Sequence, residues 1–471
     1  MQLHKYRIAA AFIAILLSAT SCKKSFIELL PPTALTPEQA LSTESDLQVA
    51  VRGAYAGLRT VEYFGRTVPV LGDLMSDNAY QSLTNTNRYT LFNNYSFTVA
   101  DGNVLGFWRG AYNCILRANN VINSPIASNA NVNQYKGEAY AIRALCYFYL
   151  VRYFAKPYTD DPNALGVPIV LTFDAGTVGQ QKPTRSKVSE VYALINSDLN
   201  QAYSLITQFV NSTQFSKYAA KGLQAKVYLT MGDKTNALTA ALDVINNSGF
   251  TVVGTSNYAT YWNQLTPRTD KLETLFEVSS DANNSSGFDG LPNIYNQAGY
   301  GDLVAADDLY ALYSAADVRK TLYSMVSRGG VATLAMNGKY PGTFGSEISD
   351  TKVLRLSEIY LIAAEASLPA SESNALTYLN YVTSRRGATP IASTGAQLFE
   401  DIITERRKEL AFEGDRYLDL QRLKRDVVRS TNYPVGARTI QYSNFRRLLP
   451  IPQTELDANE NIRSQQNPGY N

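Results

Sequence analysis

The sequence predicts a mainly α-helical protein in which tetratricopeptide-like helix pairs accompany an irregular, loop-rich part. The clearest evidence is a helical hairpin over residues 216–247. Within it, Tyr228, Ala237 and Ala241 follow Ala225 by 3, 12 and 16 residues. Small residues at these spacings are typical of tetratricopeptide pairs, in which two helices approach closely. Long polar stretches that contain aromatic residues predict the irregular part.

A second stretch repeats part of this spacing around a turn at Pro369. Ala375 and Leu379 follow Ala363 by 12 and 16 residues. Further helices are predicted where apolar residues recur every three or four positions. These helices cover residues 37–59, 103–124 and 137–154. Together the segments favour a stack of helical pairs.

The N-terminus has the order of a secretory signal. Lys5 and Arg7 precede an apolar run of 13 residues, which is too short for a permanent membrane span. Small residues then lead into Cys22. The set resembles a lipobox, in which residues 1–21 are removed and the cysteine receives a lipid; an ordinary signal beside a chance cysteine is the alternative. Residues 22–38 contain three prolines and are predicted to form an extended tether.

The residues left after the export signal exclude several chemistries. The only histidine, His4, lies in that signal, so Ser-His-Asp catalysis, Cys-His catalysis and histidine metal sites are excluded. Cys114 and Cys146 cannot form a four-thiolate cluster, and the sequence leaves a disulfide between them open. Without Lys5 and Arg7, 41 basic residues face 41 acidic ones. We therefore predict no metal site and no nucleic-acid partner.

Two long polar loops, residues 77–102 and 279–302, contain aromatic residues that argue against disorder. We expect some of these rings to stack on a ligand while neighbouring polar groups hydrogen-bond to it. The candidate ligand-binding residues are Asp77, Asn78, Tyr80, Arg88, Tyr89, Phe92, Phe288, Tyr295 and Tyr300. Trp108 opens a helix with an apolar stripe and is predicted to pack in the core. Oxygen donors cluster at 281–289, but they lack the spacing of a calcium loop, so a solvated loop is preferred there.

The acidic residues Glu405, Glu409 and Glu413 follow one another at four-residue intervals and could share one helix face. Glycoside hydrolysis requires a pair of carboxylates, so a carboxylate-dependent glycosidase is one hypothesis. However, Arg406–Glu409 and Glu413–Arg416 have the spacing of helical ion pairs. Because arginine lowers a carboxyl pKa and a general acid needs a raised one, a structural ion-pair network is preferred over catalysis.

Several strings along the chain resemble the SusD/RagB family of outer-membrane nutrient-binding lipoproteins. They are FWRGAYNCILRANNVI (107–122), GEAYAIRALCYFYLVRYF (137–154), PTRSKVSEVYALINSDL (183–199), LETLFEV (272–278), VLRLSEIYLIAAEA (353–366), IITERRKELAFEGDRYLDLQRLKR (402–425) and LLPIPQTELDANENIRSQQNPGYN (448–471). The resemblance runs from Cys22 to the last residue. It implies a helical N-terminal region, residues 39–250, and a C-terminal region with variable ligand loops, residues 251–471. Trp262 stands where the family pattern commonly has a core aromatic residue.

The resemblance also implies a function. Family members are outer-membrane lipoproteins that face the cell exterior, sit on a SusC-type TonB-dependent barrel, capture oligosaccharides and hand them over for import. They make and break no bonds, so the resemblance implies no enzyme activity and no cofactor beyond the lipid on Cys22. Peptide capture is one alternative, and a scaffold without a small ligand is another. Lys23 and Lys24 leave the membrane face open, because acidic residues are usual at this place in surface lipoproteins.

Overall fold

The computed structural model describes residues 41–172, 181–281, 283–342 and 348–470. The export signal, Cys22 and the tether lie outside these ranges, so the statements about them stay predictions. Thr43–Asn471 forms one compact unit and contains all of the described helices and strands. None of the helices in the described ranges combines the length and the hydropathy that a membrane span needs.

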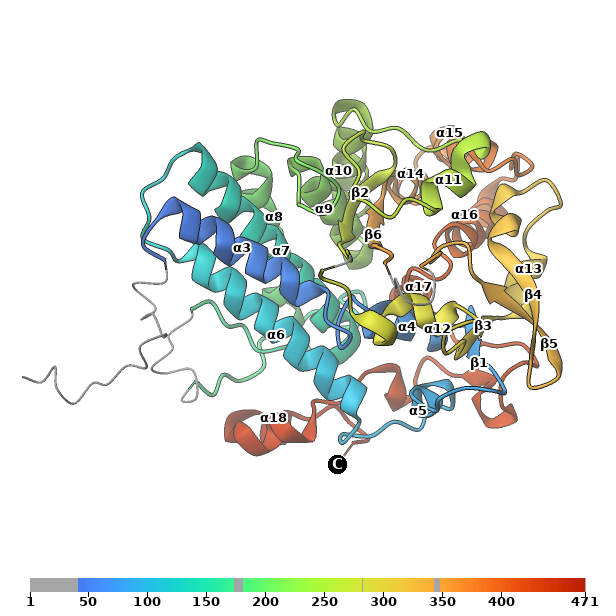
Figure 1. Cartoon of the computed structure of the whole chain (residues 1–471), viewed down its shortest axis with the longest axis horizontal. Helices are drawn as coiled ribbons and strands as arrows, with labels where there is room; N and C mark the ends of the chain where they lie inside the picture. The colour runs from blue at the N-terminus through green and yellow to red at the C-terminus, as the bar shows by residue number, and fades with distance from the viewer. Residues whose placement is uncertain (1–40, 173–180, 282, 343–347, 471) are drawn as a thin grey trace, which may run out of the picture. The chain divides into compact units, whose positions relative to one another are not determined.

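Most of this unit is an array of helices in which each packs against the next along the chain (Figure 1). The array consists of α3 (Glu44–Leu58), α6 (Gly102–Ile122), α7 (Ala130–Phe154), α8 (Val188–Leu205), α9 (Lys217–Met231), α10 (Lys234–Asn247), α14 (Leu356–Ala366), α15 (Glu372–Arg385) and α16 (Gly395–Glu409). Shorter helices lie between and after them: α4 (Thr67–Leu74), α5 (Thr90–Asn93), α11 (Tyr258–Trp262), α12 (Leu291–Tyr295), α13 (Asp307–Ala311), α17 (Arg416–Arg422) and α18 (Gln453–Ala458). The predicted mainly helical fold is confirmed.

Capping side chains decide where the predicted helices begin. Thr43 precedes α3, and its hydroxyl accepts a hydrogen bond from the Asp46 N–H at 3.2 Å. Asn129 caps α7 in the same way by accepting from the Val132 N–H at 2.9 Å. Both caps satisfy N–H groups that have no partner within the helix. The helix predicted over 137–154 therefore starts at Ala130, and it ends at Phe154 as expected.

The two predicted helix pairs are present. Gly232 ends α9 in the left-handed conformation, with φ 79°, which glycine adopts without a Cβ clash. Ala225 on α9 and Ala237 on α10 are fully buried, so their small size sets how closely the two helices approach. In the second pair, Ala363 on α14 and Ala375 on α15 are equally buried. The spacing argument therefore identified real interhelical contacts.

Short strands form the rest of the unit. They are β1 (Ala79–Gln81), β2 (Thr274–Val278), β3 (Leu303–Ala305), β4 (Tyr323–Arg328), β5 (Val331–Met336), β6 (Thr351–Arg355), β7 (Val427–Val428) and β8 (Thr439–Ile440). A four-stranded sheet has the order β1-β3-β5-β4, and β2–β6 and β7–β8 form antiparallel pairs. In the larger sheet Tyr80 of β1 pairs with Val304 of β3. This pairing joins the first polar loop, which contains β1, to the strand that directly follows the second.

The two tryptophans and the two cysteines of the described unit all lie in the core. Trp108 and Trp262 are 3% and 2% exposed, which confirms the prediction that they pack inside. Cys114 and Cys146 are fully buried free thiols, so the disulfide that the sequence left open is not formed. Cys146 lies on the buried face of α7, as its place on the apolar stripe predicts.

A close backbone approach holds α4 against the segment that follows α16. A Cβ added to Gly72 would lie 1.9 Å from the carbonyl oxygen of Gly414, well inside van der Waals contact. Gly414 itself has φ 85°, a conformation that favours glycine. Between these glycines, Asp73 accepts hydrogen bonds from the N–H groups of Phe412 (2.9 Å) and Gly414 (2.8 Å).

We expect Gly72→Ala to lower the free energy of unfolding by about 1–3 kcal/mol, because the added methyl group displaces backbone. Gly53→Ala is the matched control: it lies inside α3, and an added Cβ meets nothing within 4 Å. The free energy of unfolding of this control is expected to rise by about 0.5–1 kcal/mol, because alanine has a better helix propensity than glycine. Urea unfolding of both variants measures the difference. Equal effects at the two glycines would contradict the close approach.

Candidate functional site

The two polar loops meet at four side chains, Arg88, Phe288, Asp289 and Tyr300, which we call the Arg88 cluster. The guanidinium of Arg88 lies over the ring of Tyr300, with Cζ 3.7 Å from the ring centroid. Arg88 Nη2 and the Tyr300 hydroxyl each donate to Asp289 Oδ1, both at 3.0 Å. Phe288 packs edge-on against Tyr300, with ring centroids 4.5 Å apart. Three of the four residues are sequence candidates.

The Arg88 cluster is open to solvent. Phe288 keeps 37% of its surface exposed, and the side chains of Arg88 and Asp289 are 27% and 54% exposed. At this exposure the ion pair contributes little to stability, on the order of 0–1 kcal/mol. The cluster therefore combines accessible aromatic edges with a guanidinium and a carboxylate that can exchange their present partners for those of a ligand.

Asp302, the residue before β3, is buried and fixes the first loop beneath the Arg88 cluster. Its carboxylate accepts from the Thr86 N–H at 2.8 Å and from the Thr86 hydroxyl at 2.5 Å. Arg88 Nη1 lies 3.8 Å from the same carboxylate. Because Asp302 is only 1% exposed, these contacts form in a low-dielectric setting and hold Arg88 over Tyr300.

Two arginines that the sequence did not single out fix the second loop. Arg328, at the end of β4, donates from Nη2 to the carbonyl oxygens of Thr84 (2.5 Å) and Tyr300 (2.7 Å). Arg66 donates from Nη1 to the carbonyl oxygen of Asp289 at 3.0 Å. The Gly329-Gly330 dipeptide after Arg328 is a typical hairpin turn, so the turn was visible in the sequence although the arginine's contacts were not.

Three aromatic candidates lie in the core instead of at a ligand surface. Tyr89, Phe92 and Tyr295 are each 1% exposed or less. Tyr295 stacks on Tyr340, with ring centroids 5.4 Å apart. In this conformation the three rings have no open face for a ligand, so the structure corrects the expectation for them. The reason is that α5, which begins after Tyr89 and contains Phe92, and α12, which ends at Tyr295, both pack into the core.

The candidates Asp77, Asn78 and Tyr80 also have structural contacts. Burial alone would raise the pKa of the Asp77 carboxyl, but Arg416 and Arg407 outweigh it and hold this pKa well below its usual range. Asn78 donates from Nδ2 to Asp73 Oδ1 at 2.9 Å, and Tyr80 packs in a buried group with Tyr433. These three side chains position the first loop, so Arg88, Phe288 and Tyr300 are the candidates left facing solvent. The ion pairs of Asp77 with Arg416 and Arg407 measure 2.8 Å and 3.5 Å.

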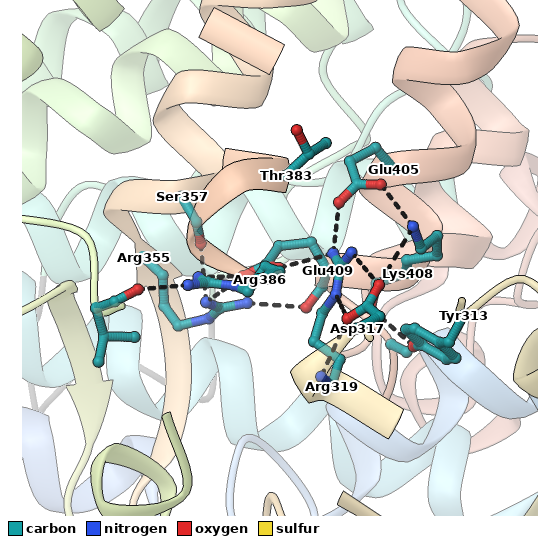
Figure 2. A network of polar contacts seen from close by, with 12 residues as sticks. Tyr313, Asp317, Arg319, Arg355, Ser357, Thr383, Arg386, Glu405, Lys408 and Glu409 are labelled. Atoms are coloured by element: carbon teal, nitrogen blue, oxygen red, sulfur yellow. Dashed lines mark hydrogen bonds and ion pairs between the residues drawn. The ribbon is translucent and has the colours of Figure 1, made fainter. Parts of the chain in front are cut away.

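The acidic residues of the C-terminal region belong to a buried ion-pair network (Figure 2). Glu409 lies between three arginines: its carboxylate is 2.8 Å from both Arg355 Nη1 and Arg386 Nη2 and 3.0 Å from Arg319 Nη1. Glu405 is 2.6 Å from Arg319 as well. Although burial raises the pKa of Glu409, Arg386 and Arg355 hold it well below the usual range. Such a carboxyl stays ionised and does not donate a proton as a general acid.

The preferred structural network is therefore present, but its pairs differ from the expected ones. Helix α16 ends at Glu409, so Glu413 does not share a helix face with Glu405 and Glu409. Arg406 contacts Asp419 and Glu358 instead of Glu409. Arg416 contacts Asp77 instead of Glu413. The pairs differ because partners from distant segments meet these side chains inside the core. Spacing along a helix predicts contacts between sequence neighbours only.

In the loop 281–289, which was considered for calcium, polar side chains hydrogen-bond to groups of the same loop. The carboxylate of Asp281 accepts from the Asn283 N–H at 2.9 Å and from Asn284 Nδ2 at 3.0 Å. Across the part of the chain that the structure describes, no three His, Cys, Asp or Glu residues gather so that they could hold a metal ion.

Two family models match the chain. One is described as the SusD family and matches residues 324–470. The other is described as starch-binding and associating with the outer membrane, and it matches residues 25–229. The first match contains Arg355, Arg386 and Glu409 of the ion-pair network, and the second contains the whole first loop with Arg88. The second loop, residues 279–302, lies between the two matched segments.

A curated relative decides the family. SusD-like protein P2 of Formosa agariphila is 30% identical, and the match covers 99% of this chain and 100% of the relative. The chain belongs to the SusD-like family. A SusD superfamily protein from Bacteroides thetaiotaomicron has the same fold, with a TM-score of 0.82, 30% identity, and 90% of this chain and 100% of that chain covered. A laminarin-binding SusD-like protein also shares the fold, with a TM-score of 0.71, 22% identity, and 90% and 99% coverage.

Proposed function

We propose that this SusD-like protein binds oligosaccharides at the Arg88 cluster and delivers them to a SusC-type TonB-dependent transporter. The observation that carries the proposal is the meeting of the two polar loops, which places Arg88, Phe288 and Tyr300 together at the surface. The family description as starch-binding and the laminarin-binding relative support a carbohydrate as the ligand. No step of this function requires a bond to be made or broken.

The chemistry of the Arg88 cluster fits a sugar. The C–H faces of a pyranose pack on aromatic rings, and Phe288 and Tyr300 offer such surfaces. Sugar hydroxyl groups both donate and accept hydrogen bonds, so they can donate to Asp289 and accept from Arg88. Peptide capture stays the alternative, because the edge strand β4 ends at Arg328 beside Tyr300 and could pair with a peptide backbone. The starch-binding family description and the laminarin-binding relative favour the carbohydrate.

The proposed location follows the N-terminal signal. A lipid on Cys22 would tether the mature chain to the outer membrane, and the family description of outer-membrane association supports this. We propose that the Arg88 cluster faces the cell exterior beside the transporter. Protease treatment of intact cells is expected to cleave the protein. Full protection with cleavage only after lysis would place it on the periplasmic side.

Affinity electrophoresis identifies the ligand. The mature chain, residues 22–471 with Cys22→Ser, is run through gels that contain starch, laminarin, xylan, pectin or no polysaccharide. We expect at least one polysaccharide to retard the protein and chromatography of the incubated polysaccharide to show no released sugar. Retardation by none of them, together with binding of short peptides in calorimetry, would contradict the proposal in favour of peptide capture. Release of sugar would favour the glycosidase hypothesis.

A further inference from the structure

A cavity of about 520 Å³ opens between α3, α7 and the end of β2, away from the side chains of the Arg88 cluster. Its volume falls within the range of about 300–1,000 Å³ that is common for small-molecule sites. Phe276 of β2 lines it and is held by Phe215, with ring centroids 3.9 Å apart and nearly parallel planes. This part of the cavity lining is thus apolar.

One face of α3 turns polar side chains toward this cavity. Gln48, Arg52, Tyr55 and Arg59 all line it, and their spacing of three or four residues places them on the same side of the helix. A polar helix face is usually simply solvated. Here α7 lies opposite and contributes Tyr135, so the polar groups line the walls of a half-open cavity in which Arg52 stays exposed.

Several of these polar groups have spare hydrogen-bonding capacity. Within the described ranges, no residue hydrogen-bonds the side chains of Gln48 and Gln214, which both line the cavity. Arg59 Nε is buried and has no hydrogen-bond partner among the described residues. Amide groups can donate and accept at once, which suits a ligand that carries hydroxyl groups. A buried donor without a partner costs stability unless a ligand or water satisfies it.

A buried carboxyl group lies among them. Glu138 of α7 lines the cavity and is 2% exposed. Gln134 Nε2 donates to its Oε1 at 2.8 Å, yet burial raises its pKa to about 7. Near neutral pH this group can therefore donate as well as accept a hydrogen bond. The positive charge of Arg52 favours the ionised carboxylate and offsets part of the rise in this pKa.

We propose that this cavity is a second carbohydrate site, which takes a mono- or disaccharide between α3 and α7. Tyr55 and Tyr135 supply ring surfaces, and Gln48 and Gln214 supply hydrogen bonds to hydroxyl groups. The loop of the Arg88 cluster forms one wall: Asn284 lines the cavity, and the Ser286 hydroxyl donates to the Arg59 carbonyl oxygen at 2.9 Å. The two sites share this loop but use different side chains.

The test measures disaccharide binding to the mature chain by calorimetry and by saturation-transfer NMR. The probes are maltose, cellobiose, laminaribiose and xylobiose. The cavity variant is the double substitution Gln48→Ala and Gln214→Ala, which removes side chains without described hydrogen bonds and is expected to leave the melting temperature unchanged. Gln201→Ala is the matched control, because Gln201 is an exposed glutamine on α8.

We expect at least one disaccharide to bind, its affinity to fall at least fivefold in the cavity variant, and Gln201→Ala to bind as the wild type does. Binding of no probe, or equal binding to the cavity variant and the wild type, would overturn the second site. Loss of disaccharide binding in Tyr300→Ala would assign it to the Arg88 cluster instead. Polysaccharide retardation of the cavity variant is measured alongside: unchanged retardation with lost disaccharide binding shows that the two sites act separately.

Discussion

Replacing Arg355 by methionine is expected to lower the free energy of unfolding by about 3–5 kcal/mol, because it leaves buried carboxylates without their partner. The Arg355 guanidinium contacts Glu273, Glu409 and Glu413, with 2.8 Å to the last two. Arg355 and Glu409 are completely buried, and the Glu413 side chain is 4% exposed. Methionine fills part of the space but offers no positive charge.

Arg425→Met is the control for this prediction. Arg425 Nη2 lies 2.6 Å from Glu400 Oε1, but the two side chains are 32% and 50% exposed. Solvent screens this pair, so its loss is expected to cost about 0–1 kcal/mol. Urea unfolding followed by circular dichroism measures both variants. If Arg355→Met and Arg425→Met cost the same, the C-terminal acidic residues do not hold the fold together as proposed.

Tyr300→Ala is expected to weaken binding of the retained polysaccharide at least tenfold, which corresponds to about 1.4 kcal/mol. The substitution removes a stacking surface and also releases Arg88, which lies over this ring, and Phe288, which packs against it. Because Tyr300 is half-exposed, the fold should tolerate the change.

Retardation in affinity gels at several polysaccharide concentrations gives the dissociation constant of this variant. Tyr378→Ala serves as its control, because Tyr378 is also half-exposed but lies on α15. It is expected to bind the polysaccharide as the wild type does. Similar weakening in both variants, or none in Tyr300→Ala, would separate carbohydrate binding from the Arg88 cluster.

The helix pairs could be predicted from the sequence because each depends on local spacing. Helix geometry fixes the offsets between the small residues that pack where two paired helices meet. Such offsets separate Ala225, Ala237 and Ala241, and all three are buried as expected. The start of α7 was missed because Asn129 lies outside the apolar stripe and acts through a cap. A prediction based on capping residues as well as on periodicity would place the start of this helix after Asn129.

The candidate site could be predicted only in part. Loop composition identified Arg88, Phe288 and Tyr300, but it could not distinguish them from Tyr89 and Tyr295, which are equally aromatic and equally surrounded by polar residues. The difference arises from tertiary structure, since the packing of α5 and α12 buries one set and leaves the other exposed. The same holds for the acidic residues, whose partners come from distant segments.

The most direct test of carbohydrate binding at the Arg88 cluster is a crystal structure of the mature chain with an oligosaccharide of the retained polysaccharide. We predict an uncleaved sugar chain in contact with the rings of Phe288 or Tyr300 and hydrogen-bonded to Arg88 or Asp289. A ligand bound only elsewhere on the molecule, or one cleaved into shorter products, would contradict this function.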